Sequence, residues 1–190
     1  MRLTFNGLAC LLLISLAPAF AADKKAAKAI RLGDKVPDFS VERLDGSKQK
    51  LSQLRKDKRL SGQGVTMLTF WCSFCDSCRD IDKPLQNLAK TYRGKCLVLA
   101  VDASYGETTK QVREFFRENK LRLPVVLDEY GKSADIFGVT MTTTTVVIDA
   151  QGRLRYIGRL KDGDKTPAED ALKAVLAGTD VLVQSTKPRG

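Results

Sequence analysis

The sequence predicts an α/β fold, a three-layer α/β/α sandwich around a mixed central sheet with an N-terminal β-hairpin. Short apolar runs rich in β-branched residues alternate with stretches whose apolar residues recur at helical spacing. This alternation favours parallel strand pairs, while a turn at 149–152 between two apolar runs adds an antiparallel pair. The chain has 190 residues, 43% hydrophobic and 28% charged, which is enough to bury the core of one globular domain.

The first part of the predicted fold is a hairpin followed by a short helix. Phe39 and Val41 alternate with polar neighbours, Asp45-Gly46 is typical of a turn, and residues 49–51 return as the second strand. The elements expected after the short helix are a strand at 65–70, a helix at 75–92, a strand at 96–101, a helix at 107–119, a strand at 124–127, a short helix at 133–137, strands at 144–148 and 154–157, and a last helix at 167–177.

The last helix carries its own start and stop signals. Thr166 is a good N-cap residue, Pro167 suits the first helical position, and Glu169 would complete a capping box. Gly178 follows the last apolar residue and is typical of a helix C-terminus. We therefore expect an ordered helix between these residues.

The N-terminus resembles a secretory signal. Arg2 is followed by an apolar stretch at 8–17, too short to span a bilayer comfortably, and by an A-x-A cleavage site at 19–21. Cleavage after Ala21 would remove Cys10 and send the domain to the periplasm or another extracytoplasmic space, where disulfides persist. An uncleaved membrane anchor is the alternative. The expected segments are a signal peptide at 1–21, a mobile lead at 22–32, the domain at 33–178 and a C-terminal tail at 179–190.

The sequence contains no histidine, and this excludes several kinds of site. Ser-His-Asp and Cys-His nucleophiles need an imidazole, as do c-type haem attachment and many zinc or copper sites. The formal net charge is +10, and the densest basic stretch is Lys48–Arg59. This stretch could face an acidic partner or a membrane surface, or it could be a solvated helix and loop face. No nucleic-acid partner is expected.

Three of the five cysteines lie in the stretch WCSFCDSCR at residues 71–79. Cys75 falls where the expected strand gives way to the helix, and unpaired amides and the helix dipole favour a thiolate there. Cys78 lies one helical turn deeper. We therefore expect Cys75 to attack a partner's disulfide and Cys78 to resolve the resulting mixed disulfide. Asp76 opposes and Arg79 favours the thiolate, so the sequence leaves the sign of the pKa shift open.

Cys72 and Cys96 have several possible roles. Cys72 could be a small buried residue, an alternative disulfide partner of Cys75, or a third thiol that helps to hold Cu(I), zinc or part of an iron–sulfur cluster. Cys96 lies in an apolar strand and is expected to be inert, with a distant resolving thiol as the alternative. A metal site would lack a fourth nearby cysteine, so we expect no metal and no cofactor.

Two stretches resemble known proteins. GDKVPDF at 33–39 resembles the opening of redoxin domains, and FWCSFCDSCR at 70–79 is similar to the F-W-x-x-W-C-x-x-C-R stretch of thioredoxin-like proteins of the TlpA/ResA type. The resemblance extends to about residue 158. It implies a thioredoxin-like fold, a redox-active pair at Cys75 and Cys78, and substrate contacts at Trp71 and Phe74. It also implies disulfide-bearing or dithiol exported partners, an upstream membrane electron donor, and reduction rather than oxidation of the client.

The resemblance also points to two further positions. Counting back from Ile148-Asp149, Thr143 stands where the family has a cis-proline beside the redox sulfurs, so we expect a trans or strained peptide bond there. Thr143 also brings an N–H and a hydroxyl, either of which could bond a thiolate or a substrate. The acid that moves the resolving thiol's proton is implied to be Glu107, with Asp102 second.

Three other functions compete with disulfide exchange. Thr69 and Cys72 offer the T-x-x-C half of the peroxiredoxin motif, although Val65 replaces its proline. A thiol peroxidase using Cys72 or Cys75 is therefore one alternative. A cysteine-based metal-binding protein is the second, and a redox-inactive scaffold is the third.

Overall fold

The computed structural model describes residues 29–128 and 130–187. Seven strands form one mixed sheet in the order β2-β1-β5-β4-β3-β6-β7. The strands are β1 Ser40–Arg43, β2 Lys48–Lys50, β3 Ser61–Phe70, β4 Gly94–Asp102, β5 Val125–Leu127, β6 Thr144–Ile148 and β7 Leu154–Arg159. The helices are α1 Leu51–Lys56, α2 Asp76–Thr91, α3 Thr109–Glu118, α4 Lys132–Phe137 and α5 Pro167–Ala177.

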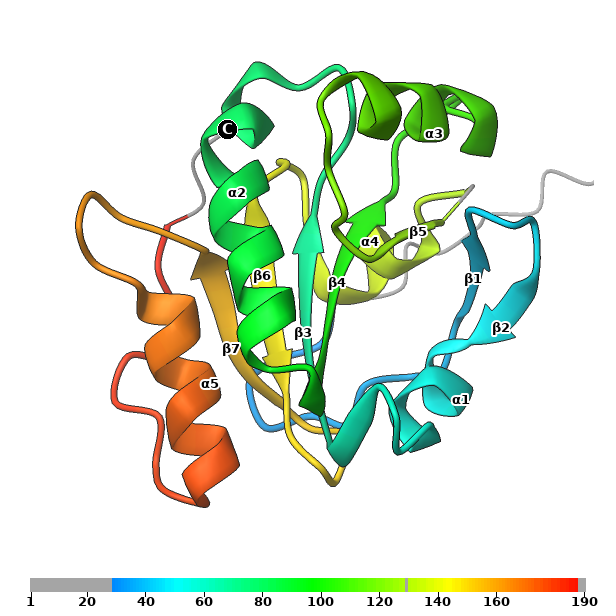
Figure 1. The fold of residues 1–190 in the computed structure, drawn as a ribbon. Helices are drawn as coiled ribbons and strands as arrows, with labels where there is room; N and C mark the ends of the chain where they lie inside the picture. The colour runs from blue at the N-terminus through cyan, green and yellow to red at the C-terminus, as the bar shows by residue number, and fades with distance from the viewer. Residues whose placement is uncertain (1–28, 129, 188–190) are drawn as a thin grey trace, which may run out of the picture.

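The three central strands β3, β4 and β5 run parallel, and the outer strands pair antiparallel on either side of them. Figure 1 shows α2 and α5 on the near face of the sheet, with α4 behind it. The predicted thioredoxin-like sandwich with its N-terminal hairpin is therefore confirmed. Within the described ranges, no helix is both long enough and apolar enough to cross a bilayer.

Side-chain alternation along the strands separates two cores. On β3, Val65 and Met67 face the helices α2, α3 and α5, while Leu68 and Phe70 face α1 and α4. Phe70 meets Phe137 of α4 edge to face, with ring centroids 6.1 Å apart. Both faces of β3 are covered, which explains why its sequence is a continuous apolar run rather than an alternating one.

The start of α5 differs from the prediction. Thr166 occupies the N-cap position and Pro167 the first turn, but the Thr166 side chain makes no capping hydrogen bond. Glu169 instead accepts a hydrogen bond from the Tyr92 hydroxyl and pairs with Lys173. The predicted capping box is therefore wrong, because tertiary contacts with α2's end compete for the glutamate.

The predicted signal peptide lies outside the described residues. The described chain begins at residue 29, and Ile30 donates its N–H to the carbonyl of Ile136. At the other end of the described chain, the hydroxyls of Thr186 and Tyr156 share one hydrogen bond. The Thr186 N–H donates a second hydrogen bond to the Ile157 carbonyl. The segment after α5 thus lies against β7 as far as residue 187.

Candidate active site

Cys75 lies at the junction of β3 and α2. β3 ends at Phe70, and Cys75 has extended backbone angles and occupies the N-cap position of α2. The first turn closes with a hydrogen bond from the Cys78 N–H to the Cys75 carbonyl, 3.1 Å long. The sequence places the two cysteines three residues apart, so they face each other across one helical turn.

The surroundings of Cys75 favour its thiolate. Partial burial opposes the charge, but the Cys78 thiol and the hydroxyls of Ser77 and Thr142 hydrogen-bond the sulfur, and together they lower the pKa of Cys75 to about 7. The Ser77 Oγ lies 3.1 Å and the Thr142 Oγ1 3.0 Å from Cys75 Sγ. The shift that the sequence left open is therefore downward, and its main causes are hydroxyl and thiol donors.

Cys78 has the opposite character. Its side chain is fully buried, and burial, together with its hydrogen bond to Cys75, raises the pKa of the thiol well above its ordinary range. All four cysteines of the described chain are free thiols in this structure. One half-exposed sulfur that ionises readily and one buried sulfur that does not is the asymmetry expected of an attacking and a resolving thiol.

The other two cysteines are poorly placed for ionisation. Cys72 is 2% exposed, and burial together with Cys75, Asp102 and Glu107 raises the pKa of its thiol to about 12. Burial alone raises the pKa of Cys96 to about 12. Since the thiolate is the reactive form, neither thiol is activated in this structure.

A pair of carboxyl groups lies beside the motif loop. Asp102 is 1% exposed, and burial, reinforced by a hydrogen bond with Glu107, raises the pKa of Asp102 to about 7. Glu107 accepts hydrogen bonds from the N–H and the hydroxyl of Ser73. Ser104 bonds both carboxylates. The predicted acid Glu107 therefore contacts the motif, on the side of Cys72 and Ser73.

Trp71 supports the motif from inside the fold. It is 1% exposed, its ring lies against Phe115 and Phe116, and its indole N–H donates to Asp82 over 2.7 Å. Arg79 pairs with Asp82 and donates to the backbone carbonyls of Ser73 and Cys72. Trp71 thus presents no surface to a partner here, because its indole packs inward, and Arg79 braces the loop.

The surface around Cys75 carries the remaining predicted residues. Phe74 is 69% exposed, beside the attacking sulfur in sequence, and Met141 is also exposed. Thr143 is buried and has φ of +63°, an uncommon conformation for a β-branched residue; the described chain contains no cis peptide bond. Thr143 donates its N–H to the Phe70 carbonyl. The hydroxyl that reaches Cys75 belongs to the preceding residue, Thr142.

The sequence prediction missed three functional neighbours. Thr142 lies 67 residues from Cys75 along the chain, so only its place next to the aligned proline position could have indicated the contact. Ser77 lies inside the motif and could have been considered as a donor to the sulfur. The buried partner of Trp71, Asp82, carried no sequence signal beyond its helical spacing from Arg79.

The metal-binding alternative gains no support from the geometry. Across residues 29–128 and 130–187, no three histidine, cysteine, aspartate or glutamate side chains are arranged to hold a metal ion. The asymmetry between Cys75 and Cys78 fits disulfide exchange.

Comparisons with known proteins identify the family of this chain. The AhpC/TSA family model matches residues 32–157. The chain belongs to this family. It is 33% identical over 129 residues to the thioredoxin-like protein YneN of Bacillus subtilis, covering 67% of this chain and 71% of that protein. It is 31% identical over 159 residues to the thiol-disulfide oxidoreductase ResA of Bacillus anthracis, covering 80% and 85%.

Solved structures agree with this assignment. A putative thiol:disulfide interchange protein DsbE from Chlorobium tepidum matches with a TM-score of 0.62 and 28% identity, over 78% of this chain and 99% of that one. A hypothetical protein from Sinorhizobium meliloti has a TM-score of 0.70 at 23% identity, covering 85% and 94%, which shows the fold alone. The predicted redoxin family is confirmed, and the chain is a thiol–disulfide oxidoreductase.

Proposed function

We propose that this protein is exported and exchanges disulfides with partner proteins through Cys75 and Cys78, reducing its clients. One observation carries the assignment of roles: Cys75 is partly accessible with a pKa lowered to about 7, while Cys78 is buried with a raised pKa. The relatives named thiol-disulfide oxidoreductase ResA support the reaction class. The signal-like N-terminus supports export.

The proposed reaction has two exchange steps. The Cys75 thiolate attacks one sulfur of a client disulfide, forms a mixed disulfide and releases the other client sulfur as a thiolate. Cys78, after losing its proton, then attacks Cys75 Sγ, closes the Cys75–Cys78 disulfide and releases the second client sulfur. The client gains two electrons and the protein loses two, which an upstream membrane electron donor would restore.

Glu107 is the proposed proton acceptor for the resolving step. Its carboxylate contacts the motif at Ser73 and shares a buried site with Asp102, whose raised pKa lies near neutrality. Glu107 hydrogen-bonds Ser73 and Ser104 rather than Cys78, so it would act on Cys78 through an intervening water. With its pKa raised to about 7, Asp102 is partly protonated near neutral pH.

Client contacts are proposed for the residues that surround the attacking sulfur. Phe74 offers an exposed aromatic ring, and Thr142 and Thr143 form the loop across the site. Trp71 stabilises the motif loop through its hydrogen bond to Asp82, rather than by contacting the client. A peroxidase that uses Cys72 is disfavoured, because burial and two carboxylates keep that thiol protonated.

A trapping experiment tests the proposal. Reduced Cys78→Ser protein, mixed with insulin as a disulfide-bearing client, should accumulate a mixed disulfide at Cys75, since the proposed resolving thiol is absent. Cys75→Ser should trap nothing, and Cys72→Ser should behave like the unsubstituted chain. Trapping through Cys72, or turnover that survives Cys75→Ser, would contradict the assignment. Mass measurement of the exported protein, expected to begin at residue 22, tests the cleavage site.

A further inference from the structure

Among the described residues, strand β4 has no strand partner on one edge of its first half, where the Cys96 N–H instead bonds the Tyr92 carbonyl. β5 pairs only with Ala100–Asp102, so the residues of β4 before Ala100 have no strand on that side. Figure 1 shows β5 as a short arrow beside the upper part of β4. The opposite edge of β4 pairs with β3 from Cys96 to Val101, and again at Gly94 beyond an irregularity in β3. The sheet therefore contains a gap between the start of β4 and the β1–β2 hairpin.

Backbone directions along β4 identify which groups face this gap. The Ala100 N–H bonds the Pro124 carbonyl and the Asp102 carbonyl accepts from Asp128, both toward β5, whereas the Val101 carbonyl faces β3. Because backbone groups alternate between the two edges of a strand, Val98 turns its N–H and C=O toward the gap. In the described ranges, no strand partner reaches Val98 on that edge.

Pro124 explains why the ladder stops there. If the parallel register continued, residue 124 would donate its N–H to the Val98 carbonyl, but proline has no N–H. The chain before it turns away, since the Arg122 N–H bonds the side chain of Gln86 on α2. The missing strand partner beside Val98 is thus a consequence of Pro124 and of the hydrogen bond between Arg122 and Gln86.

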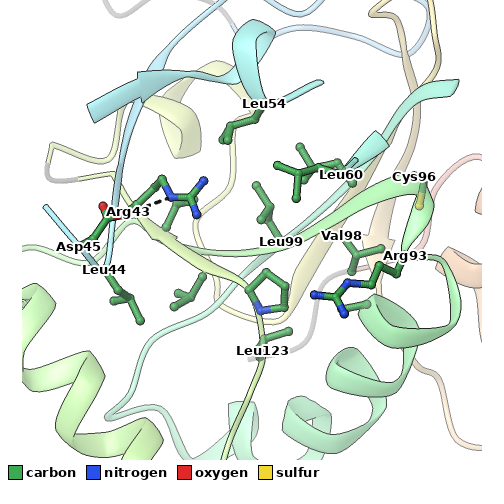
Figure 2. Close-up of a pocket in the computed structure, with 15 residues that line it drawn as sticks. Arg43, Leu44, Asp45, Leu54, Leu60, Arg93, Cys96, Val98, Leu99 and Leu123 are labelled. Carbon is green, nitrogen blue, oxygen red and sulfur yellow. Dashed lines mark ion pairs between the residues drawn. The ribbon is translucent and has the colours of Figure 1, made fainter. Parts of the chain in front are cut away.

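The gap forms a cavity with a volume of about 400 Å³ that reaches both faces of the sheet. Its walls are mainly apolar: Leu54, Leu60 and Leu99 contribute from one core, and Val98 and Leu123 from the other. Figure 2 shows these side chains around the cavity. A volume of this size falls in the range of ligand-binding pockets.

Two guanidinium groups and one carboxylate, that of Asp45, line the cavity and leave it a net positive charge. Figure 2 shows Arg43 and Arg93 reaching toward it from opposite sides. Arg43 pairs loosely with Asp45 at 3.8 Å, and Arg93, an exposed residue, forms no ion pair with the described side chains. The cavity therefore complements an anionic group next to an apolar one.

We propose that this cavity binds an extended, acidic peptide segment of a partner protein by adding a strand to β4. The segment's backbone would pair with the N–H and C=O of Val98, its apolar side chains would fill the leucine-lined walls, and a carboxylate would meet Arg93. The binding is non-covalent and lies apart from the thiol chemistry at the other end of β3 and β4. It would let the protein hold a partner without consuming its redox pair.

A blocked pentapeptide, acetyl-Glu-Val-Ile-Val-Glu-amide, tests the proposal on the full chain carrying Cys75→Ser and Cys78→Ser. Backbone NMR spectra and amide hydrogen exchange are recorded with and without the peptide. We expect saturable shifts at residues 96–99 and slower exchange of the Val98 amide. Shifts confined to other surfaces, or an unchanged Val98 amide at saturating peptide, would overturn the proposal.

Two controls separate strand addition from general attraction. A peptide with N-methylated valines has the same side chains but lacks backbone donors, so it should not protect Val98; equal binding by this peptide would refute strand pairing. Arg93→Glu should weaken binding of the acidic peptide about fivefold, as expected for one exposed charge pair reversed. Lys90→Glu is the matched control on α2 outside the cavity, and an equal loss there would contradict a specific role for Arg93.

Discussion

The hydroxyl oxygen of Thr142 lies 3.0 Å from the sulfur of Cys75, although the two residues are 67 positions apart in the chain. The contact joins the loop before β6 to the first turn of α2. It places a hydrogen-bond donor where thioredoxin-like relatives of the TlpA/ResA type are expected to have the residue before a proline. The reactivity of Cys75 therefore depends on a residue outside the cysteine motif.

Removing the Thr142 hydroxyl should make the Cys75 thiolate less stable. We expect Thr142→Val to raise the pKa of Cys75 by about 0.5 to 1, because one hydrogen bond to a partly exposed charged group contributes on the order of 1 kcal/mol. Thr142→Ser keeps a donor and should leave the pKa close to that of the unsubstituted protein. The pH dependence of iodoacetamide labelling, read by mass spectrometry at Cys75, measures both variants. Equal midpoints for valine and serine would show that the hydroxyl has no such role.

Asp102 should make stability fall as pH rises. Burial and Glu107 raise its folded pKa to about 7, above its unfolded value, so the folded chain binds more protons than the unfolded chain between about pH 4 and pH 7. Its contribution to the free energy of unfolding is therefore present below this window and lost through it. Asp102→Asn should gain stability relative to the unsubstituted chain between about pH 4 and about pH 8, as read from urea unfolding at each pH. A constant difference across this range would contradict the raised pKa.

The hydrogen bond between Trp71 and Asp82 should stabilise the fold. Trp71→Phe removes the indole donor and leaves a buried carboxylate with one partner fewer, so we expect the free energy of unfolding to fall by about 1 to 3 kcal/mol. Packing is also lost, and a double-mutant cycle separates the two effects. In an Asp82→Leu background the same substitution should cost less. A cost that does not depend on residue 82 would assign the whole effect to packing.

The spare cysteine in the motif should be dispensable for exchange. Cys72 is buried, and its raised pKa keeps it protonated, so Cys72→Ala should leave the rate of insulin reduction within about twofold of the unsubstituted rate. Peptide mapping of the oxidised protein should find only the Cys75–Cys78 disulfide. A substantial population of Cys72–Cys75 disulfide would reveal an alternative pairing that this structure does not favour.

Local patterns were sufficient to predict most of the fold. The hairpin around Asp45-Gly46, the apolar run of β3 and the helical spacing in α2 each depend on neighbours in sequence, and the structure has all three. The capping box at Thr166 failed because Tyr92, far away in the chain, takes the glutamate's oxygen. The capping preferences of residues at a helix end do not show that a distant side chain will compete for the same group.

The site was predictable in its cysteines but not in their surroundings. The three-residue spacing and the strand-to-helix junction are local, so the sequence alone is enough to predict Cys75 and Cys78 as the redox pair. The contact between Thr142 and Cys75 depends on tertiary packing, and so does the hydrogen bond from Trp71 to Asp82. The burial of Trp71 depends on the same packing. The gap beside β4 depends on the exact register of β5 against β4, which no single-sequence pattern contains.

The most direct test compares the two thiols of the reduced, unsubstituted protein. Samples are labelled briefly with iodoacetamide across a pH series, and labelling at Cys75 and Cys78 is quantified separately by mass spectrometry. The account predicts a labelling midpoint for Cys75 near pH 7. It predicts no significant labelling of Cys78 until the pH is well above the pKa of an ordinary thiol. A Cys75 midpoint near that of an ordinary thiol, or labelling of Cys78 first, would contradict it.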